Sequence, residues 1–122
     1  MWQDIPGCEG YQADKSGHIR NKNTKYILKP FVNDQGYLRI CLTLKGKNSF
    51  HMVHVLVATA WLDNPNNLPD VNHKNNKRQD NRVCNLEWVS HSDNIKQIWI
   101  SGAWKHKRVK SKLDKRRKNN VF

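Results

Sequence analysis

The pattern of apolar and polar positions changes along the chain. In the first 50 residues it predicts short strands joined by turns. Polar residues 14–17 separate two short segments of strand character, which predicts a hairpin. A second turn is expected at residues 33–36, where Asn, Asp and Gly gather. The stretch that follows predicts a strand with one buried face, because every second residue is apolar: Leu38, Ile40, Leu42 and Leu44.

The segment at residues 53–62 is apolar nearly all round and is interrupted only by His54 and Thr59. Its three valines would also suit a strand. Its length of ten residues and its two alanines favour a buried helix instead. The helix should end before Pro65, because the residue that precedes a proline is pushed out of the helical region.

Four elements are predicted after this helix and its loop. They are a strand at residues 71–73, a polar loop at 74–82, a strand at 85–89 and a helix at 90–102. Ser90 is the expected N-cap of the helix, with Asp93 in the position that completes a capping box. The predicted fold class is therefore α+β, with a small antiparallel β region first and two strands and a helix after it.

The domain organisation that we expect has three parts. Residues 1–50 form an N-terminal β module, residues 51–102 form the core that contains the predicted strands and helices, and residues 103–122 form a basic tail. A chain of 122 residues, only 37% hydrophobic, has room for one compact domain with a thin core.

The charge of the chain points to a polyanionic partner. It carries 22 Lys and Arg against 10 Asp and Glu, a net charge of +12, and its isoelectric point is about 9.9. Nine Lys or Arg and one Asp lie at residues 105–118, where only Val109 and Leu113 are apolar. Such a segment buries too little surface to fold by itself, and we expect it to follow a phosphate backbone.

The composition argues against a membrane-spanning protein and against a secreted one. No stretch approaches the roughly 18 apolar residues of a membrane span, and no signal-peptide core is visible, so a cytoplasmic protein without a membrane partner is expected. The three cysteines lie more than 30 residues apart at positions 8, 41 and 84. We expect free core thiols, no disulfide and no structural zinc.

The most informative pattern runs from residue 71 to residue 94. It contains Val71-Asn72-His73, then Asn85-Leu86-Glu87-Trp88-Val89, and finally Asn94. This pattern resembles the HNH nuclease family, whose phage members read VNHxxGxxxxNxxxNLEWVxxxxN. Residues 54–61 look like the HRLVAxAF helix of that family. Residues 2–21 are similar to the small module that often precedes HNH domains in homing endonucleases.

The resemblance implies a ββα-metal fold and a divalent-metal-dependent DNA endonuclease. By resemblance His73 is the general base, and Asn85 fixes its orientation and tautomer through the side-chain carbonyl. Asn72 and Asn94 would bind one divalent cation, Mg²⁺ or Mn²⁺. This division of roles matches the chemistry, because phosphodiester hydrolysis needs a base for water and a cation for the leaving oxygen.

The chain departs from the family pattern at one ligand, since many members have Asp where Asn72 stands. A neutral amide binds Mg²⁺ less strongly than a carboxylate, although Asp70 lies on the same face of the strand and could compensate. Two alternatives stay open. The neutral ligands favour a non-catalytic DNA-binding protein on an HNH scaffold, and the charge alone favours an RNA-binding or ribosome-associated protein.

Double-stranded DNA is the expected partner, and its phosphates would be contacted from three regions. The candidates are His54, Lys74, Lys77, Arg78, Arg82, Arg20, Arg39, Lys105, Lys107, Arg108, Lys110, Arg116 and Arg117. Contacts to phosphates provide affinity and position without reading the sequence. A monomer would nick one strand, whereas a double-strand break needs a dimer or two nicks, and the oligomeric state stays open.

The basic tail generates a first prediction. A variant that ends at Trp104 should bind DNA with a flatter dependence on salt, because each neutralised phosphate contributes about 0.9 to the slope of log K against log salt. Binding to all DNA sequences should weaken about equally, and the melting temperature should barely change. Titrations of both proteins at several salt concentrations measure the slope. An identical slope would mean that the tail serves solubility, and the contacts would pass to the 74–82 loop and the N-terminal strands.

Overall fold

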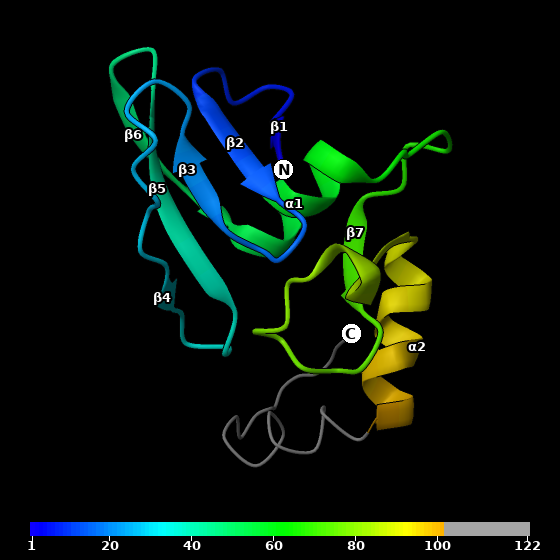
Figure 1. Cartoon of the computed structure of the whole chain (residues 1–122). Coiled ribbons are helices and arrows are strands. Elements are labelled where there is room, and N and C mark those ends of the chain that lie inside the picture. Colours follow the sequence, from blue (N-terminus) through cyan, green and yellow to red (C-terminus); the bar gives the residue numbers. More distant parts are fainter. Residues whose placement is uncertain (102–122) are drawn as a thin grey trace. The chain divides into compact units, whose positions relative to one another are not determined.

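A computed structural model describes residues 1–101, with the backbone alone for residues 97–101 (Figure 1). The chain divides into two units, Met1–Val89 and the part from Ser90 onward, and each is described by itself. The predicted end of the last helix at Gly102 and the predicted tail contacts of residues 105–117 lie outside the described residues.

The first sheet of the larger unit is antiparallel and has the order β1 (Trp2–Asp4), β2 (Tyr11–Asp14) and β3 (Ile19–Asn21). The hairpin predicted around residues 14–17 is confirmed. The carboxylate of Asp14 holds the turn, because its Oδ1 accepts hydrogen bonds from the backbone N–H groups of Ser16 (3.0 Å) and His18 (2.8 Å). Short polar side chains of this kind stabilise turns by capturing backbone donors.

The second sheet is also antiparallel, with the order β4 (Phe31–Val32), β5 (Leu38–Leu44) and β6 (Lys47–Met52). The predicted alternation on β5 is confirmed, because Ile40 and Leu42 are buried. Lys45 and Gly46 form the turn into β6, both with positive φ (52° and 77°), which is the backbone that two-residue hairpin turns require.

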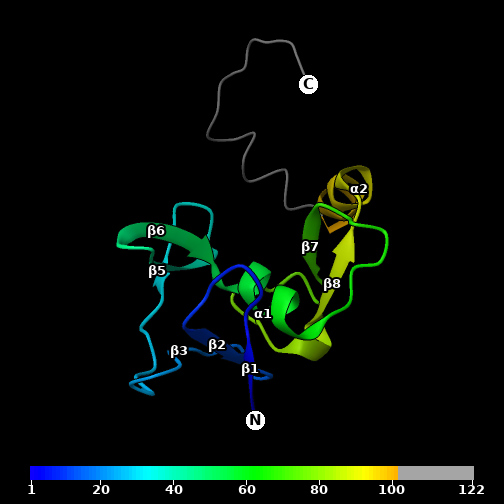
Figure 2. The ribbon, with the colours of Figure 1, turned by 90° about the horizontal axis from the view of Figure 1, so that it is seen from above.

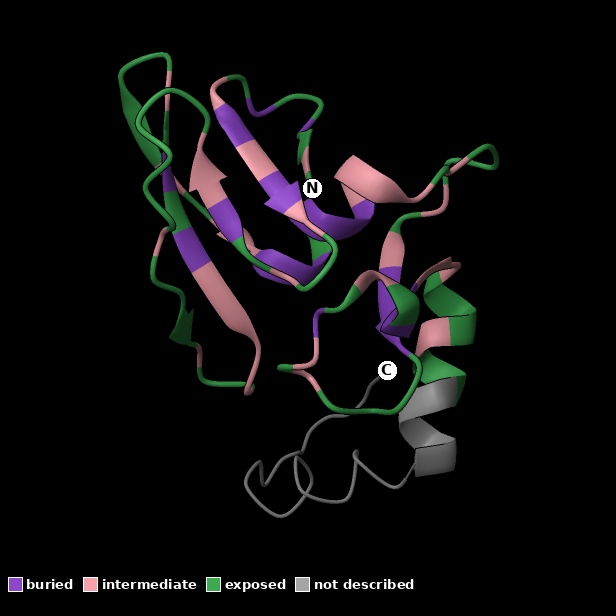
Figure 3. Ribbon diagram, in the orientation of Figure 1, coloured by how far each residue is buried: buried purple, intermediate pink, exposed green. Residues whose placement is uncertain are grey.

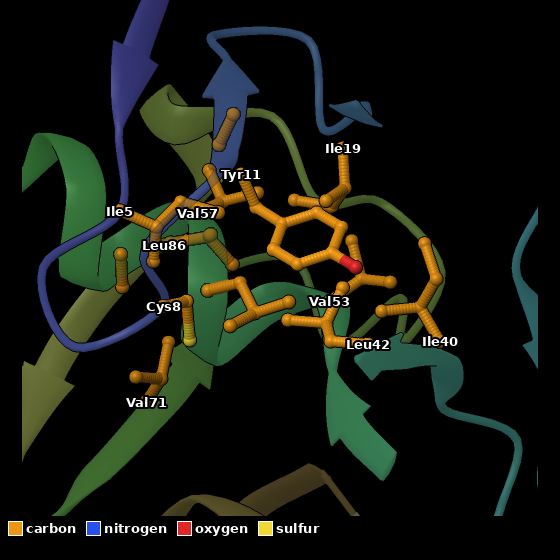
Figure 4. Packing of buried hydrophobic residues seen from close by; sticks show 13 residues of the cluster. Ile5, Cys8, Tyr11, Ile19, Ile40, Leu42, Val53, Val57, Val71 and Leu86 are labelled. Carbon is orange, nitrogen blue, oxygen red and sulfur yellow. The ribbon is translucent and has the colours of Figure 1, made fainter. Parts of the chain in front are cut away.

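Helix α1 (Val53–Trp61) packs among the strands, as Figure 2 shows, and contacts strands of all three sheets. Its buried face is apolar apart from His54, which confirms the predicted buried helix (Figure 3). Residues on both sides of the domain boundary expected at position 50 share one hydrophobic core. Figure 4 shows that core, which includes Ile19, Leu42, Val57, Val71 and Leu86.

A two-stranded sheet completes the larger unit, with β7 (Asp70–His73) antiparallel to β8 (Leu86–Val89). The polar loop predicted at residues 74–82 and a short 3-10 helix, η1 (Val83–Asn85), connect the two strands. Helix α2 (His91–Ser101) begins the second unit, and the Ser90 hydroxyl accepts the backbone N–H of Asp93 (3.1 Å). The predicted N-cap and the α+β fold class are confirmed.

Two expectations about the chain can be compared with residues 1–101. No helix in this part is both long and apolar enough to cross a membrane. All three cysteines are free, but only Cys8 is buried, while Cys41 and Cys84 are exposed. The expectation of core thiols is therefore wrong for two of the three, because Cys41 lies on the outward face of β5 and Cys84 on the surface of η1.

Candidate active site

His73 is the last residue of β7, and its side chain is buried, with 4% of its surface exposed. Its Nε2 lies 2.7 Å from Oδ1 of Asn81, which belongs to the polar loop. An amide oxygen only accepts hydrogen bonds, so this contact holds the proton on Nε2. The lone pair of His73 is then on Nδ1, where it can accept a proton from water.

The surroundings of His73 favour its neutral form. Burial lowers its pKa below the ordinary value of 6.5, against the opposing effects of the Asn81 hydrogen bond and the charge of Asp80. Arg78 adds to the lowering. A histidine with a lowered pKa is unprotonated near neutral pH, which is the state that a general base needs.

The aromatic rings of His54 and Tyr37, from separate parts of the unit, pack beside the ring of His73. His54 of α1 has its ring centroid 4.8 Å from that of His73 and 5.1 Å from that of Tyr37, on which it stacks. The guanidinium of Arg78 lies 4.9 Å from the Tyr37 ring centroid, and Arg78 also donates to the backbone oxygen of Gln35. His73 is therefore packed against α1 and against the residue that precedes β5, as well as being hydrogen-bonded.

His54 is buried with 8% of its surface exposed, and its Nδ1 has no hydrogen-bond partner among residues 1–101. Burial, with a smaller effect of nearby His73, lowers the pKa of His54 to about 4. The sequence makes His54 a candidate either for contact with a DNA phosphate or for a hydrogen bond in the core. The structure places it in the interior, where α1 turns the side chain toward the rings of Tyr37 and His73.

The Asn85 side chain makes its hydrogen bonds to the 74–82 loop and not to His73, which corrects the role assigned to it by resemblance. Its Oδ1 accepts the backbone N–H of Asn75 (3.0 Å), and its Nδ2 donates to Oδ1 of Asn75 (3.0 Å) and to the backbone oxygen of Asp80 (2.8 Å). Asn85 therefore holds the 74–82 loop, while Asn81 holds His73. The family pattern also has an asparagine at the position of Asn81, so the sequence contained the information needed to consider Asn81 as the partner of His73.

The rest of the 74–82 loop is held by polar side chains in the absence of apolar ones. Asp80 receives two hydrogen bonds from Arg82, each 2.8 Å long, and one from Nδ2 of Asn75 (2.8 Å). The hydrogen bonds of Arg82 lower the pKa of the Asp80 carboxyl. Asn76 adopts a positive φ of 62°, which asparagine tolerates better than most residues.

The predicted DNA-contacting residues of the loop are in different situations. Lys74 and Lys77 are exposed, and the polar loop presents them to solvent next to His73. Arg82 is also exposed, but its guanidinium is paired with Asp80. Unlike Arg82, neither lysine is paired with a carboxylate among residues 1–101, so both have charge to offer to a phosphate.

The two candidate arginines of the N-terminal strands are held against aromatic rings. Arg20 lies 4.3 Å from the ring centroid of Trp2 and donates from Nε to Gln12 (2.9 Å). The guanidinium of Arg39 lies 5.2 Å from the ring centroid of Phe31 and 4.7 Å from that of Phe50. These contacts fix the side chains, and a guanidinium stacked on a ring can still donate from its edge.

Asn72, a predicted metal ligand, is buried and lies opposite Glu87 in the β7–β8 pairing. Its Nδ2 donates to Oε2 of Glu87 (2.9 Å), so the amide oxygen is the atom that can serve as a ligand. Sequence analysis missed Glu87, whose position opposite Asn72 follows from the strand register. Oxygen donors of this kind, with a carboxylate among them, suit Mg²⁺ and Mn²⁺.

Asn94, the second predicted metal ligand, lies on α2 in the second unit. Its backbone N–H donates to the carbonyl of Ser90 (3.0 Å), as expected in the first turn of the helix. The structure describes α2 within its own unit, so a shared cation between Asn94 and Asn72 stays a prediction.

Comparisons with known proteins place this geometry in context. Residues 1–43 match the NUMOD4 motif. Two uncharacterized HNH endonucleases of Acanthamoeba polyphaga mimivirus are similar to the chain, at 36% identity over 85 residues and 38% over 100 residues. These matches cover 70% and 78% of this chain but only 26% and 25% of the viral proteins.

The DNA endonuclease I-HmuI of Bacillus phage SP01 is similar at 33% identity over 103 residues, which are 84% of this chain and 59% of the phage enzyme. A solved structure of the HNH homing endonuclease I-HmuI, described as showing DNA binding and cleavage, matches with a TM-score of 0.73 and 31% identity. That match covers 89% of this chain and 65% of the other. The chain thus spans between a quarter and about two thirds of the relatives it matches.

The burial of His54 generates a prediction about stability and pH. A histidine whose pKa falls from 6.5 to about 4 on folding binds its proton more tightly in the unfolded chain. Stability is therefore full above pH 6.5 and is lost as the pH falls toward 4. Lowering the pH from 7 to 5 should reduce the free energy of unfolding by about 2 kcal/mol, as measured by urea titration.

The control for this prediction is His54→Phe, which keeps a ring in the stack and removes the titrating group. Its free energy of unfolding should depend much less on pH over the same range, with the remaining slope coming from His73. Identical pH profiles for the two proteins would contradict the assignment of the slope to His54.

Proposed function

This chain is a relative of the HNH endonucleases with a NUMOD4 motif at its N-terminal end, and on that premise we propose that it hydrolyses DNA phosphodiester bonds. The observation that carries the proposal is the buried His73, whose Nε2 is held by the amide oxygen of Asn81 at 2.7 Å. This arrangement is that of a general base with a fixed tautomer.

The proton transfer follows from this arrangement. Nδ1 of His73 takes the proton from a water molecule as that water attacks the phosphorus atom. The imidazolium that forms keeps its hydrogen bond from Nε2 to Asn81, which stabilises the charged ring and prevents it from turning. The rings of His54 and Tyr37 restrict the same movement from the side.

The residues present fit a divalent cation of the type that HNH homing endonucleases use. Asn72 would contribute its amide oxygen and Asn94 a further oxygen, with the carboxylate of Glu87 beside Asn72. We propose that the active site holds one divalent cation, either Mg²⁺ or Mn²⁺. When bound, such an ion neutralises negative charge on the scissile phosphate and the leaving 3′ oxygen.

Double-stranded DNA is the proposed substrate. Lys74 and Lys77 lie exposed on the loop that follows His73, where they would contact phosphates close to the reacting one. Contacts of this type orient the duplex without reading its sequence. A single site of this kind cuts one strand, so the expected product is a nick.

A second candidate function is DNA binding without catalysis. It is favoured by Asn72, because a neutral amide replaces the stronger carboxylate ligand. Glu87 offsets this argument, since its carboxylate lies 2.9 Å from that amide. A nicking assay on supercoiled plasmid with Mg²⁺, with Mn²⁺ and with EDTA separates the two functions, because a binding protein leaves the plasmid intact in all three.

The role of His73 gives the next prediction. His73→Ala should lower the rate of plasmid nicking by at least about 100-fold, which is the usual effect of losing a general base. DNA affinity, measured by fluorescence anisotropy without a divalent ion, should stay within about twofold of the original. Nicking by His73→Ala at a rate near that of the unmodified protein would refute the assignment of the base.

The proposed ligands give a separate prediction about metal dependence. Asn94→Ala should raise the Mg²⁺ or Mn²⁺ concentration that gives half-maximal nicking, because one oxygen ligand is lost. Asn72→Asp should lower that concentration, because it adds a negative charge at the ion. An unchanged metal dependence in both variants, or full activity in EDTA, would count against this site.

A further inference from the structure

The turn between β2 and β3 packs directly against the loop residue that holds the base. A Cβ atom built on Gly17 would lie 3.0 Å from Cβ and 3.0 Å from the backbone oxygen of Asn81. Two residues earlier, the backbone oxygen of Lys15 accepts the N–H of Val83 (2.9 Å). The NUMOD4 segment therefore contacts the end of the 74–82 loop at two neighbouring points.

This turn has its own internal supports, so it can act as a fixed surface. The Asp14 carboxylate accepts the N–H groups of Ser16 and His18 and also pairs with Nδ1 of His18 (2.9 Å). Gly17 adopts a φ of +100°, which side-chain-bearing residues rarely adopt. Glycine also permits the close approach of the backbone to Asn81.

Asn81 needs such a surface, because its side chain has little else to hold it. It is buried with 4% of its surface exposed, and its Nδ2 has no hydrogen-bond partner among residues 1–101. Among residues 1–101 its side chain takes part in one hydrogen bond, which Oδ1 accepts from Nε2 of His73. Gly17 lies against the Cβ atom and the backbone of Asn81, so it fixes the point from which the amide reaches His73.

We propose that Gly17 is a positioning residue for the reaction, which acts through Asn81 on the orientation of His73. The N-terminal segment that matches NUMOD4 then forms part of the catalytic apparatus by supporting the base. This inference rests on the proposed nuclease function. Gly17 is expected to affect the catalytic step rather than the binding of DNA, because it lies behind Asn81 and not at the phosphate.

The test compares two alanine substitutions that impose the same backbone strain. Gly17→Ala adds a Cβ against Asn81, whereas Gly10→Ala adds one at a similar φ of +92° with no heavy atom within 4 Å. We expect Gly17→Ala to lower kcat for plasmid nicking by about 10-fold relative to Gly10→Ala, through a shift of a few tenths of an ångström at the base. KM and DNA affinity should be equal in the two variants.

A double substitution tests whether the effect passes through Asn81. In an Asn81→Ala background the amide that orients His73 is already absent, so Gly17→Ala should cause almost no further loss of kcat by this route. Non-additive effects of this kind identify residues that act through one another. A further 10-fold loss in that background would overturn the proposal, and so would equal kcat values for Gly17→Ala and Gly10→Ala.

A measurement that does not depend on activity separates this inference from the proposed function. The ¹⁵N chemical shifts of the His73 ring should show the proton on Nε2 in the full chain and in Gly10→Ala. Gly17→Ala should show a mixture of tautomers. If the full chain does not nick DNA, the nuclease function fails, while the ring shifts still decide whether Gly17 orients His73.

A second variant covers the case in which Gly17→Ala does not fold. Val83→Pro removes the N–H that binds Lys15 and suits its position, because proline is accepted at the first residue of a helix and Arg82 before it is extended (φ −63°, ψ 141°). It should shift the His73 tautomer in the same direction. Unchanged ring shifts in Val83→Pro would overturn the proposal.

Discussion

The burial of α1 against three small sheets is the constraint on which the rest of the larger unit depends. Each sheet has only two or three strands, which is too few to bury a core independently. Val53, Leu56 and Val57 provide the surface that all three sheets share. The same packing carries His54 inside and sets it against His73, so the orientation of His73 is linked to the formation of the core.

Beyond the hydrophobic core, hydrogen bonds between polar side chains hold the 74–82 loop in place. The 74–82 loop has no apolar residue, and amide and carboxylate side chains hold its shape through short-range hydrogen bonds. Such a network is costly if any member is left without a partner in the interior. Asn85, at the end of η1, is hydrogen-bonded to the loop and Asn81 is hydrogen-bonded to His73, so the two asparagines divide a task that one sequence position was expected to perform.

The sequence was sufficient for the elements with strong patterns and insufficient for contacts that depend on the path of the chain. Alternation along β5, the apolar run of α1 and the motif around His73 predicted their structures correctly. Strands β1 and β4, of three and two residues, are too short to show a period. The contact of Asn81 with His73 depends on how the loop folds back, and the pairing of Asn72 with Glu87 depends on the strand register, neither of which spacing determines.

The stacking of arginines on aromatic rings has a consequence for the thermodynamics of association. A free arginine side chain loses rotamer freedom when it meets a phosphate, and that loss reduces affinity by up to about 2 kcal/mol. Arg20 on Trp2, Arg39 beside Phe50 and Arg78 on Tyr37 have lost much of that freedom already on folding. These three arginines therefore lose rotamer entropy when the protein folds. Arginines on a flexible surface would lose the same entropy when they bind a phosphate, and their affinity would be lower for it.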